Sequence, residues 1–551
     1  MATTGASPQF IFHNANVITV DPKFRKARAV AIAGNRIAEV GADEEVLKRA
    51  GPDTQLVDLH GKTVVPGFID AHVHAIHVGV SLLPGYVQFN DCRSIGDMLA
   101  AIARKAESTP RGEWIQGSGH FDFDLIQEGR FPNRWELDRA VPNHPFFMRI
   151  RGHLGVANSK ALEVLGVTKN SPVPAGGYVF KDERGELTGL MLDNAVYDLA
   201  MPKLPRTTRE EWLSAIRLMN QRFLREGITS AVNQSGETLS YLQELKERGE
   251  LGTRWQANHQ GSSNYFHRPV EDIAKAVRDL GAVTGQGDAW LRAGAIGELH
   301  SDGLIEAPWM HEPYAQDQFG PNWKGLLRHD RETLRAICLA AADRGFQMEV
   351  HASGDAAMEM VLDIYEEVNR QVSVRDRRWL VTHGGILPTP RSVERARNLG
   401  IIVSTQQPVL WTQSHYYKQF WGEKAVANVF ANRTWLEGGV LINGSSDVGI
   451  SPLLGIYMYV TRKNFFGEAL GPEQAISREE AIKLFTIYGA YSTFEERLKG
   501  SIEAGKLADL AVLSDDPLTV PEEKIKEIQV LMTVVDGKIA YEKSGSATTK
   551  P

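Results

Sequence analysis

The chain has 551 residues, of which 23% are charged and 42% hydrophobic, and its formal net charge is -7. Acidic and basic residues are interspersed, so the sequence has neither the basic stripe that binds nucleic acid nor a polybasic membrane patch, and we expect a small, roughly neutral substrate. Its two cysteines, Cys92 and Cys338, exclude a disulfide framework and a thiolate metal cage.

Membrane and export signals are missing from the sequence. Residues 1–12 have no basic region followed by an apolar core, and no uninterrupted apolar run reaches membrane-spanning length. We therefore expect a cytoplasmic protein that contacts neither membranes nor nucleic acids. Its length suggests a large catalytic domain with a smaller appended one.

Both ends of the chain are predicted to be rich in β-strands. Extended apolar segments cover residues 11–20, 29–40, 55–65, 507–513 and 530–541. Turn residues such as Asp536-Gly537 separate or interrupt them. We expect residues 1–66 and 499–551 to build one small β-sandwich together.

Eight apolar segments between these ends are predicted to be strands, and several end in reactive side chains. They cover residues 68–74, 228–233, 254–259, 291–300, 346–351, 379–383, 401–407 and 440–447. Helical segments alternate with them. This pattern indicates an α/β fold, a (β/α)8 TIM barrel over residues 67–498, with its active site at the C-terminal ends of the strands. The interval after the first strand is too long for one helix, so we expect an inserted subdomain at residues 80–205 that covers the barrel mouth.

The first barrel segment carries the strongest chemical signal. His72 and His74 lie two residues apart near its end. Alternate residues of a strand point the same way, so both imidazoles can bind one metal ion. A structural pair of buried histidines is the alternative. The turn at Pro66-Gly67 and the apolar run before the histidines favour metal ligands.

Later strands add ligands of the same kinds. His351 and His383 each end a predicted strand, and Asp447 ends the last one. Burial of a carboxylate such as Asp447 is unfavourable unless it meets a cation. On the fourth strand Glu298 and His300 share one face because they are two residues apart. We therefore expect one metal centre at the barrel mouth.

Histidine and carboxylate ligands without sulfur suit zinc best, although manganese, iron, cobalt or nickel can occupy such a site. We expect one or two divalent ions. A cation of this kind makes bound water acidic enough to supply hydroxide near neutral pH, and it polarises a carbonyl oxygen. Asp447 is predicted to be the general base that takes the proton from this water and returns it to the departing nitrogen.

The sequence also resembles a known family over almost its whole length. The matching stretches are PGFIDAHVH at 66–74, RFPNRWELDRAVPNHP at 130–145, GHLGVANSKALE at 152–163, HASGDAAMEMVLDIYEEV at 351–368 and GSIEAGKLADLAVLSDDP at 500–517. Together they are typical of the amidohydrolase superfamily, and of its YtcJ-like branch, which includes N-substituted formamide deformylases. The resemblance implies that His72, His74 and Asp447 bind one metal ion and that His351 and His383 bind a second. It also allows a homodimer.

One position departs from the family pattern. Relatives often carry a carboxylated lysine on the fourth strand, which bridges two metal ions, whereas this chain has Glu298. Both groups are singly negative, but the glutamate carboxyl lies about three bonds closer to the backbone. Glu298 is therefore expected to bind metal, either as a bridge or as a ligand of one ion. A buried ion pair is the alternative.

Residues 152–160 match the segment that faces the substrate in relatives, so the resemblance nominates His153 and Asn158 for substrate binding. A structural alternative is that Asn158 caps a helix. His300 and Trp411 complete the predicted pocket, and the aromatic cluster that begins at Trp411 favours an apolar or aromatic substrate. Other histidines, more typical of supporting or surface positions, are His77, His120, His259 and His415.

These observations predict a metal-dependent amidohydrolase that cleaves a carbon-nitrogen bond in an amide, N-formyl or cyclic amide compound. The same ligands also support a decarboxylase, an isomerase or an esterase, because a fold does not determine the reaction. A catalytically silent binding homologue is the third alternative. Retention of every ligand argues against it.

Overall fold

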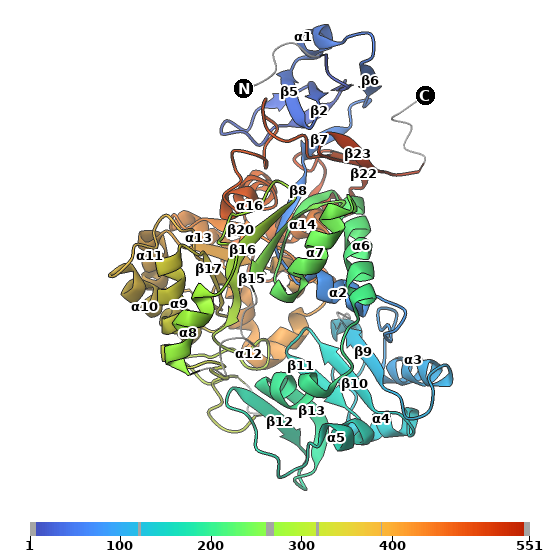
Figure 1. Ribbon diagram of the computed structural model, residues 1–551, viewed down its shortest axis with the longest axis vertical. Coiled ribbons are helices and arrows are strands. Elements are labelled where there is room, and N and C mark those ends of the chain that lie inside the picture. The colour runs from blue at the N-terminus through green and yellow to red at the C-terminus, as the bar shows by residue number, and fades with distance from the viewer. Residues whose placement is uncertain (1–6, 120–122, 260–268, 316–318, 387, 545–551) are drawn as a thin grey trace.

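A computed structural model describes residues 7–119, 123–259, 269–315, 319–386 and 388–544. Figure 1 shows three parts along the long axis of the molecule: a β-rich part with both termini, a central barrel, and a smaller sheet at the opposite end. None of the described helices combines the length and the apolar character that a membrane span requires.

Among the described residues, eight parallel strands form the central sheet. In spatial order they are β8 (Phe68–Val73), β14 (Ile228–Asn233), β15 (Arg254–His259), β16 (Leu291–His300), β17 (Met348–His351), β18 (Leu380–Thr382), β19 (Ile402–Thr405) and β20 (Ile442–Gly444). The sheet closes on itself beyond β20, because the amide of Asp447 donates to the His72 carbonyl at 3.0 Å and the amide of His74 donates to the Asp447 carbonyl at 2.9 Å. The predicted (β/α)8 barrel is confirmed.

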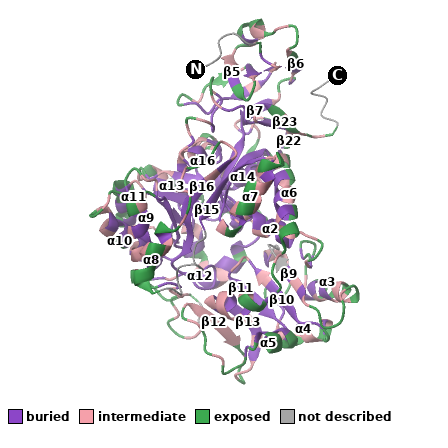
Figure 2. Cartoon of the chain, in the orientation of Figure 1, coloured by how far each residue is buried: buried purple, intermediate pink, exposed green. Residues whose placement is uncertain are grey.

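Helices surround the barrel, and Figure 2 shows that the strands are largely buried while the outer faces of the helices are exposed. The helices are α2 (Ala75–Ser81), α6 (Arg209–Arg225), α7 (Leu239–Glu247), α8 (Val270–Arg278), α9 (Arg331–Arg344), α10 (Asp355–Asn369), α11 (Pro390–Leu399), α12 (Ser414–Asn428), α13 (Asn432–Glu437), α14 (Pro452–Thr461), α15 (Arg478–Leu484) and α16 (Ile487–Ser492). The sequence sets their ends. At α9 the side chain of Asp330 accepts from the amide of Thr333, and Gly345 ends the helix with φ of 83°.

Both ends of the chain contribute to the β-rich part. One sheet contains β5 (Arg36–Gly41), β4 (Ala29–Ala33), β1 (Phe10–His13) and β6 (Gln55–Asp58). The other contains β23 (Lys538–Glu542), β22 (Val530–Val535), β21 (Leu510–Leu513), β7 (Thr63–Pro66), β2 (Asn16–Ile18) and β3 (Lys26–Ala27). Strand β21 pairs antiparallel with β7, and Phe12, Val30, Val64 and Leu510 belong to one buried cluster between the sheets. Strand β7 then leads directly into β8, the first barrel strand.

The segment between β8 and β14 contains a sheet of its own. Its strands are β12 (Gly177–Lys181), β13 (Leu187–Asp193), β11 (Leu154–Ala157), β10 (Phe146–Ile150) and β9 (Ile115–Gly119), and its helices are α3 (Ile95–Glu107), α4 (Arg134–Ala140) and α5 (Ser159–Leu165). The turn between β10 and β11 brings His153 to the barrel mouth, where its ring lies 5.7 Å from that of His351. The insertion therefore contributes directly to the site.

Candidate metal centre and active site

The six residues predicted as metal ligands converge at the C-terminal ends of the barrel strands. They are His72, His74, Glu298, His351, His383 and Asp447, from β8, β16, β17 and the turns after β8, β18 and β20. His74 Nε2 lies 3.3 Å from Glu298 Oε2 and 3.5 Å from Asp447 Oδ1. His72 Nε2 lies 3.6 Å from the same Asp447 oxygen. These separations leave the four side chains around a common point.

Glu298 lies between two pairs of histidines. Its Oε2 is 3.8 Å from His72 Nε2 and faces His74, whereas its Oε1 is 2.8 Å from His351 Nδ1 and 3.5 Å from His383 Nε2. In each group of two histidines and Glu298 the possible ligand atoms lie within 4.8 Å of one another. One carboxylate oxygen toward each histidine pair is the arrangement expected of a bridging ligand.

Sequence reasoning missed Glu349, a buried residue of β17 that fixes the orientation of His72. Glu349 Oε1 lies 2.5 Å from His72 Nδ1, and the carboxylate also accepts from Asn258 Nδ2 at 2.6 Å and Thr382 Oγ1 at 2.9 Å. With its proton held on Nδ1, His72 directs the lone pair of Nε2 into the centre. That nitrogen is buried and makes no hydrogen bond, which fits a divalent cation at this point.

The electrostatics of the centre also fit a cation. Burial raises the pKa of the Asp447 carboxyl, but the adjacent imidazoles of His72, whose Nε2 lies 3.6 Å away, and His74 outweigh it, so the net pKa lies below its usual range. The pKa of Glu298 is lowered in the same way by its histidine neighbours, against the effect of burial. Burial and the neighbouring His383 lower the pKa of His351 to about 4. Ionised carboxylates and a neutral imidazole are the states that bind metal.

Comparisons with known proteins agree with this geometry. Residues 55–541 match the model of the amidohydrolase family. The chain belongs to this family. An N-substituted formamide deformylase of Arthrobacter pascens is 31% identical over 97% of this chain and 98% of its own length, and the putative amidohydrolase YtcJ of Bacillus subtilis is 28% identical over 97% and 99%.

A solved structure is similar as well. A metal-dependent hydrolase of Pyrococcus horikoshii superposes with a TM-score of 0.71 at 25% identity, and the match covers 93% of this chain and 99% of that one. The predicted resemblance is confirmed by these matches. This amidohydrolase is a metal-dependent hydrolase that acts on carbon-nitrogen bonds.

His153 and His300, two of the predicted substrate-binding residues, lie against the predicted metal ligands of the amidohydrolase. Their rings are 5.0 Å apart, and His300 Nε2 is 3.5 Å from Glu298 Oε2. His153 Nδ1 is 2.8 Å from Asp193 Oδ1, which leaves Nε2 as the nitrogen that can contact a substrate. Asp193, at the end of β13, was not predicted from the sequence.

Asn158 is fully buried and has the contacts of the capping alternative. Its side-chain oxygen accepts from the amides of Phe146 and Ala161, both at 2.9 Å, and its nitrogen donates to the His144 carbonyl at 2.9 Å. These contacts use both ends of the amide, so we assign Asn158 to the start of α5 and not to the pocket.

The remaining histidines considered from the sequence have other partners. His77 lies 3.1 Å from Glu237, His259 bonds the Ala282 carbonyl at 2.6 Å, and His415 bonds Glu468 at 2.7 Å. None of these three belongs to the histidine and carboxylate groups of the centre in the described part of the chain. His120 lies outside the described residues.

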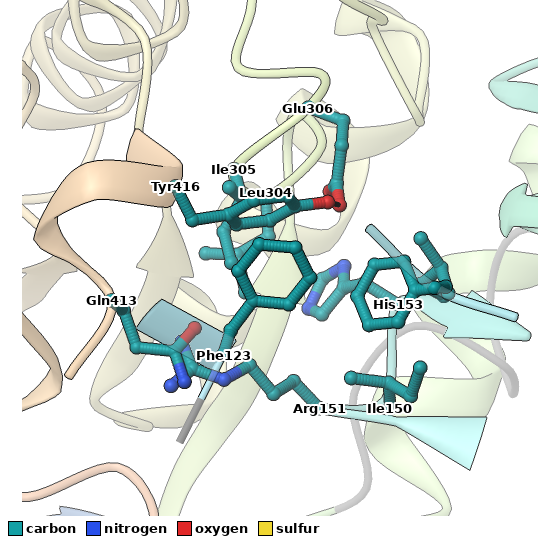
Figure 3. Close-up of a pocket in the computed structure, with 11 residues that line it drawn as sticks. Phe123, Ile150, Arg151, His153, Leu304, Ile305, Glu306, Gln413 and Tyr416 are labelled. Atoms are coloured by element: carbon teal, nitrogen blue, oxygen red, sulfur yellow. Dashed lines mark hydrogen bonds between the residues drawn. The ribbon is translucent and has the colours of Figure 1, made fainter. Parts of the chain in front are cut away.

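Two cavities open beside the centre of the amidohydrolase, and both are lined by Arg151 and Gln413. The aromatic cavity, which holds about 340 Å³ of empty space, is lined by His153, by Glu306 and by apolar residues that include Phe123, Phe131 and Tyr416. Figure 3 shows the Glu306 carboxyl and the Tyr416 hydroxyl pointing toward one another. Burial raises the pKa of Glu306 to about 7.

The second cavity, which we call the arginine cavity, has about 920 Å³ of empty space. Trp411 lines it, in the turn after the 3-10 helix Gln407–Leu410. Val448, the residue after Asp447, also lines it. The arginine cavity therefore lies next to the metal centre.

Proposed function

We propose that this amidohydrolase cleaves the carbon-nitrogen bond of a small N-substituted amide, such as an N-formyl or cyclic amide compound, with Asp447 as general base and general acid. The observation that carries the proposal is the buried Nε2 of His72, which makes no hydrogen bond and faces two ionised carboxylates. The similarity to an N-substituted formamide deformylase supports amides as the substrate class.

His72, His74, Glu298, His351, His383 and Asp447 would hold the metal. Their imidazole and carboxylate chemistry suits zinc, and Glu298 reaches both histidine pairs, as two ions require. When bound, a divalent cation supplies Lewis acidity to the reacting water and carbonyl group. Proton transfer and substrate orientation are carried out by side chains of the protein.

Asp447 moves the proton in this proposal. The residue is 8% exposed, and its carboxylate is held beside His72 and His74 and has a lowered pKa. It is ionised at neutral pH and can accept the proton of the attacking water at Oδ1 or Oδ2. The departing nitrogen needs a proton to leave as an amine, and the protonated Asp447 carboxyl supplies it.

The substrate is oriented by side chains opposite Asp447. His153, which Asp193 holds through Nδ1, presents the Nε2 lone pair, which accepts a hydrogen bond from the amide N–H of the substrate. The aromatic cavity begins at His153 and takes the apolar substituent of the substrate. His300 supports His153 by packing against its ring.

Metal analysis and product assays together test this function. We expect stoichiometric divalent metal in the purified protein and release of an amine plus a carboxylic acid from N-formyl amines with aromatic substituents. Dialysis against a chelator is expected to remove activity, and added zinc to restore it. A matched control is His415→Gln, which changes a histidine bonded to Glu468 away from the centre and should leave metal content and turnover unchanged. Full activity without metal would contradict the proposal.

A further inference from the structure

Two cationic side chains line the arginine cavity next to the metal centre. Arg151 reaches it from the turn between β10 and β11, and Arg222 from α6. None of the described residues that line this cavity is acidic, and the polar ones include Ser81, Gln88 and Asn90. The net charge of -7 for the whole chain therefore does not describe the local charge beside the active site.

The charges of these two arginines are not neutralised by ion pairs in the described part of the chain. Arg151 contacts the hydroxyl of Tyr417. Burial lowers the pKa of Arg222. The negative charge of Glu226, four residues further along the chain, offsets only part of this decrease. Both side chains are half-buried, and a partly desolvated guanidinium without a carboxylate partner is unfavourable. An anionic ligand in the cavity would remove this cost.

Arg151 is also the point at which the two cavities meet. It lines the arginine cavity on one side and the aromatic cavity on the other, and Figure 3 shows its side chain extending toward Gln413, the other shared residue. A molecule that occupies both cavities at once would place an apolar group beside Phe123 and Phe131 and a polar group beside the guanidinium. His153 and Val448 connect the two cavities to the centre.

We infer that the substrate carries a carboxylate close to its amide nitrogen and that Arg151, assisted by Arg222, binds this carboxylate. The inference rests on the proposed amide hydrolysis and narrows its substrate class to N-acylated amino acids with apolar side chains. Guanidinium groups suit the task because they present several N–H donors in a planar fork that matches a carboxylate. The expectation of a roughly neutral substrate would then be replaced by a monoanionic one.

Two amides that differ by one carboxylate test this inference. N-formylphenylalanine, as both enantiomers, is compared with N-formyl-2-phenylethylamine, and the ratio of their kcat/KM values is measured on each enzyme preparation. The ratio is independent of the fraction of protein that is active. We expect the better enantiomer of the acid to be preferred by the parent protein. Arg151→Met should lower this preference by about tenfold to a hundredfold, because a hydrogen bond to a charged group is lost.

Arg149→Met is the matched control. Arg149 lies two residues earlier, on β10, and donates to the Tyr197 hydroxyl at 3.2 Å. Within the described part of the chain it lines neither cavity. Arg149→Met should therefore prefer the acid over the amine to the same extent as the parent protein. Arg222→Met should lower the preference less than Arg151→Met, and Arg151→Lys should retain part of it.

The possible outcomes separate this inference from the proposed function. If the formylated amine is hydrolysed as well as the acid or better, amide hydrolysis stands and carboxylate binding by Arg151 is wrong. An equal preference in Arg151→Met and the parent protein also overturns it. If neither compound is hydrolysed, the proposed function fails for formamides. Carboxylate binding is then tested by calorimetric titration of both compounds into Asp447→Asn. Equal affinities reject the carboxylate site, and tighter binding of the acid supports it.

Discussion

Glu349 Oε1 lies 2.5 Å from His72 Nδ1, so a carboxylate on the fifth barrel strand sets the direction of a predicted metal ligand on the first. Asn258 of β15 and Thr382 of the neighbouring strand β18 hold the same carboxylate. His72 is thereby fixed with Nε2 facing Glu298 and Asp447. The contact between His72 and Glu349 therefore links β8, the first barrel strand, to β17 on the other side of the barrel.

The first prediction concerns this contact. Glu349→Gln removes the negative charge but keeps a similar shape, and the amide can present its NH2 group to His72 Nδ1, which then favours the wrong tautomer. We expect metal affinity to fall by about tenfold to a hundredfold, measured by competition with a chelator of known affinity. Glu359→Gln, on α10 and bonded to the exposed His311, is the control. Unchanged affinity in Glu349→Gln would show that His72 does not need this partner.

The second prediction concerns Glu298, whose two oxygens face different histidine pairs. If it bridges two ions, Glu298→Ala should lower the metal content of the protein by about one equivalent and reduce turnover at least about a hundredfold. Metal analysis after desalting measures the first effect, and amide hydrolysis the second. Glu332→Gln, a largely exposed position at the start of α9, is the control. A variant with full metal content and activity would exclude the bridging role.

The convergence of these side chains at one end of the barrel could be predicted from the sequence because strand geometry is local. Two-residue spacing puts His72 and His74 on one face, and the same spacing in Glu349-Val350-His351 was a signal for Glu349 that was not used. Strand ends were less accurate. The last strand was expected to reach Asp447, but β20 ends at Gly444. Asp447 lies beyond it with φ of 64°, in the bridge that closes the barrel.

The pocket could not be predicted to the same extent. Arg151 and His153 belong to an inserted sheet, and its placement over the barrel depends on packing between segments far apart in sequence. Asn158 lies only five residues from His153, yet its side chain caps α5. Spacing along the chain therefore identified the segment that reaches the mouth, but tertiary contacts decide which of its side chains face the substrate.

The third prediction separates metal binding from proton transfer. Asp447→Asn keeps an oxygen near His72 and His74 but cannot accept a proton, so we expect kcat to fall about a hundredfold to ten-thousandfold. Bound metal should be reduced much less than in Glu298→Ala, because four histidines and Glu298 remain. Steady-state kinetics and metal analysis on the same sample distinguish the two effects. Wild-type turnover in Asp447→Asn would refute its role as the base.

The last prediction follows from the buried carboxyl of Glu306, whose pKa is raised from 4.5 to about 7 by burial, although the Tyr416 hydroxyl donates to it. Between these two values the folded protein retains a proton that the unfolded chain has lost. Stability from this group is therefore fully present below about pH 4.5 and declines as the pH rises to about 7, by about 3 kcal/mol at most. Glu306→Gln cannot titrate and should be free of this decline.

Thermal unfolding of the parent protein and of Glu306→Gln, measured at intervals between pH 5 and pH 8 at a fixed zinc concentration, tests this sign. The melting temperature of the parent should fall relative to that of the variant as the pH rises, and the difference should level off above about pH 7. Other buried acids, such as Asp302 with a pKa raised to about 8, titrate in both proteins and cancel in the comparison. Parallel curves would mean that Glu306 is already ionised in the folded protein at pH 5, and that the aromatic cavity carries a negative charge at its end.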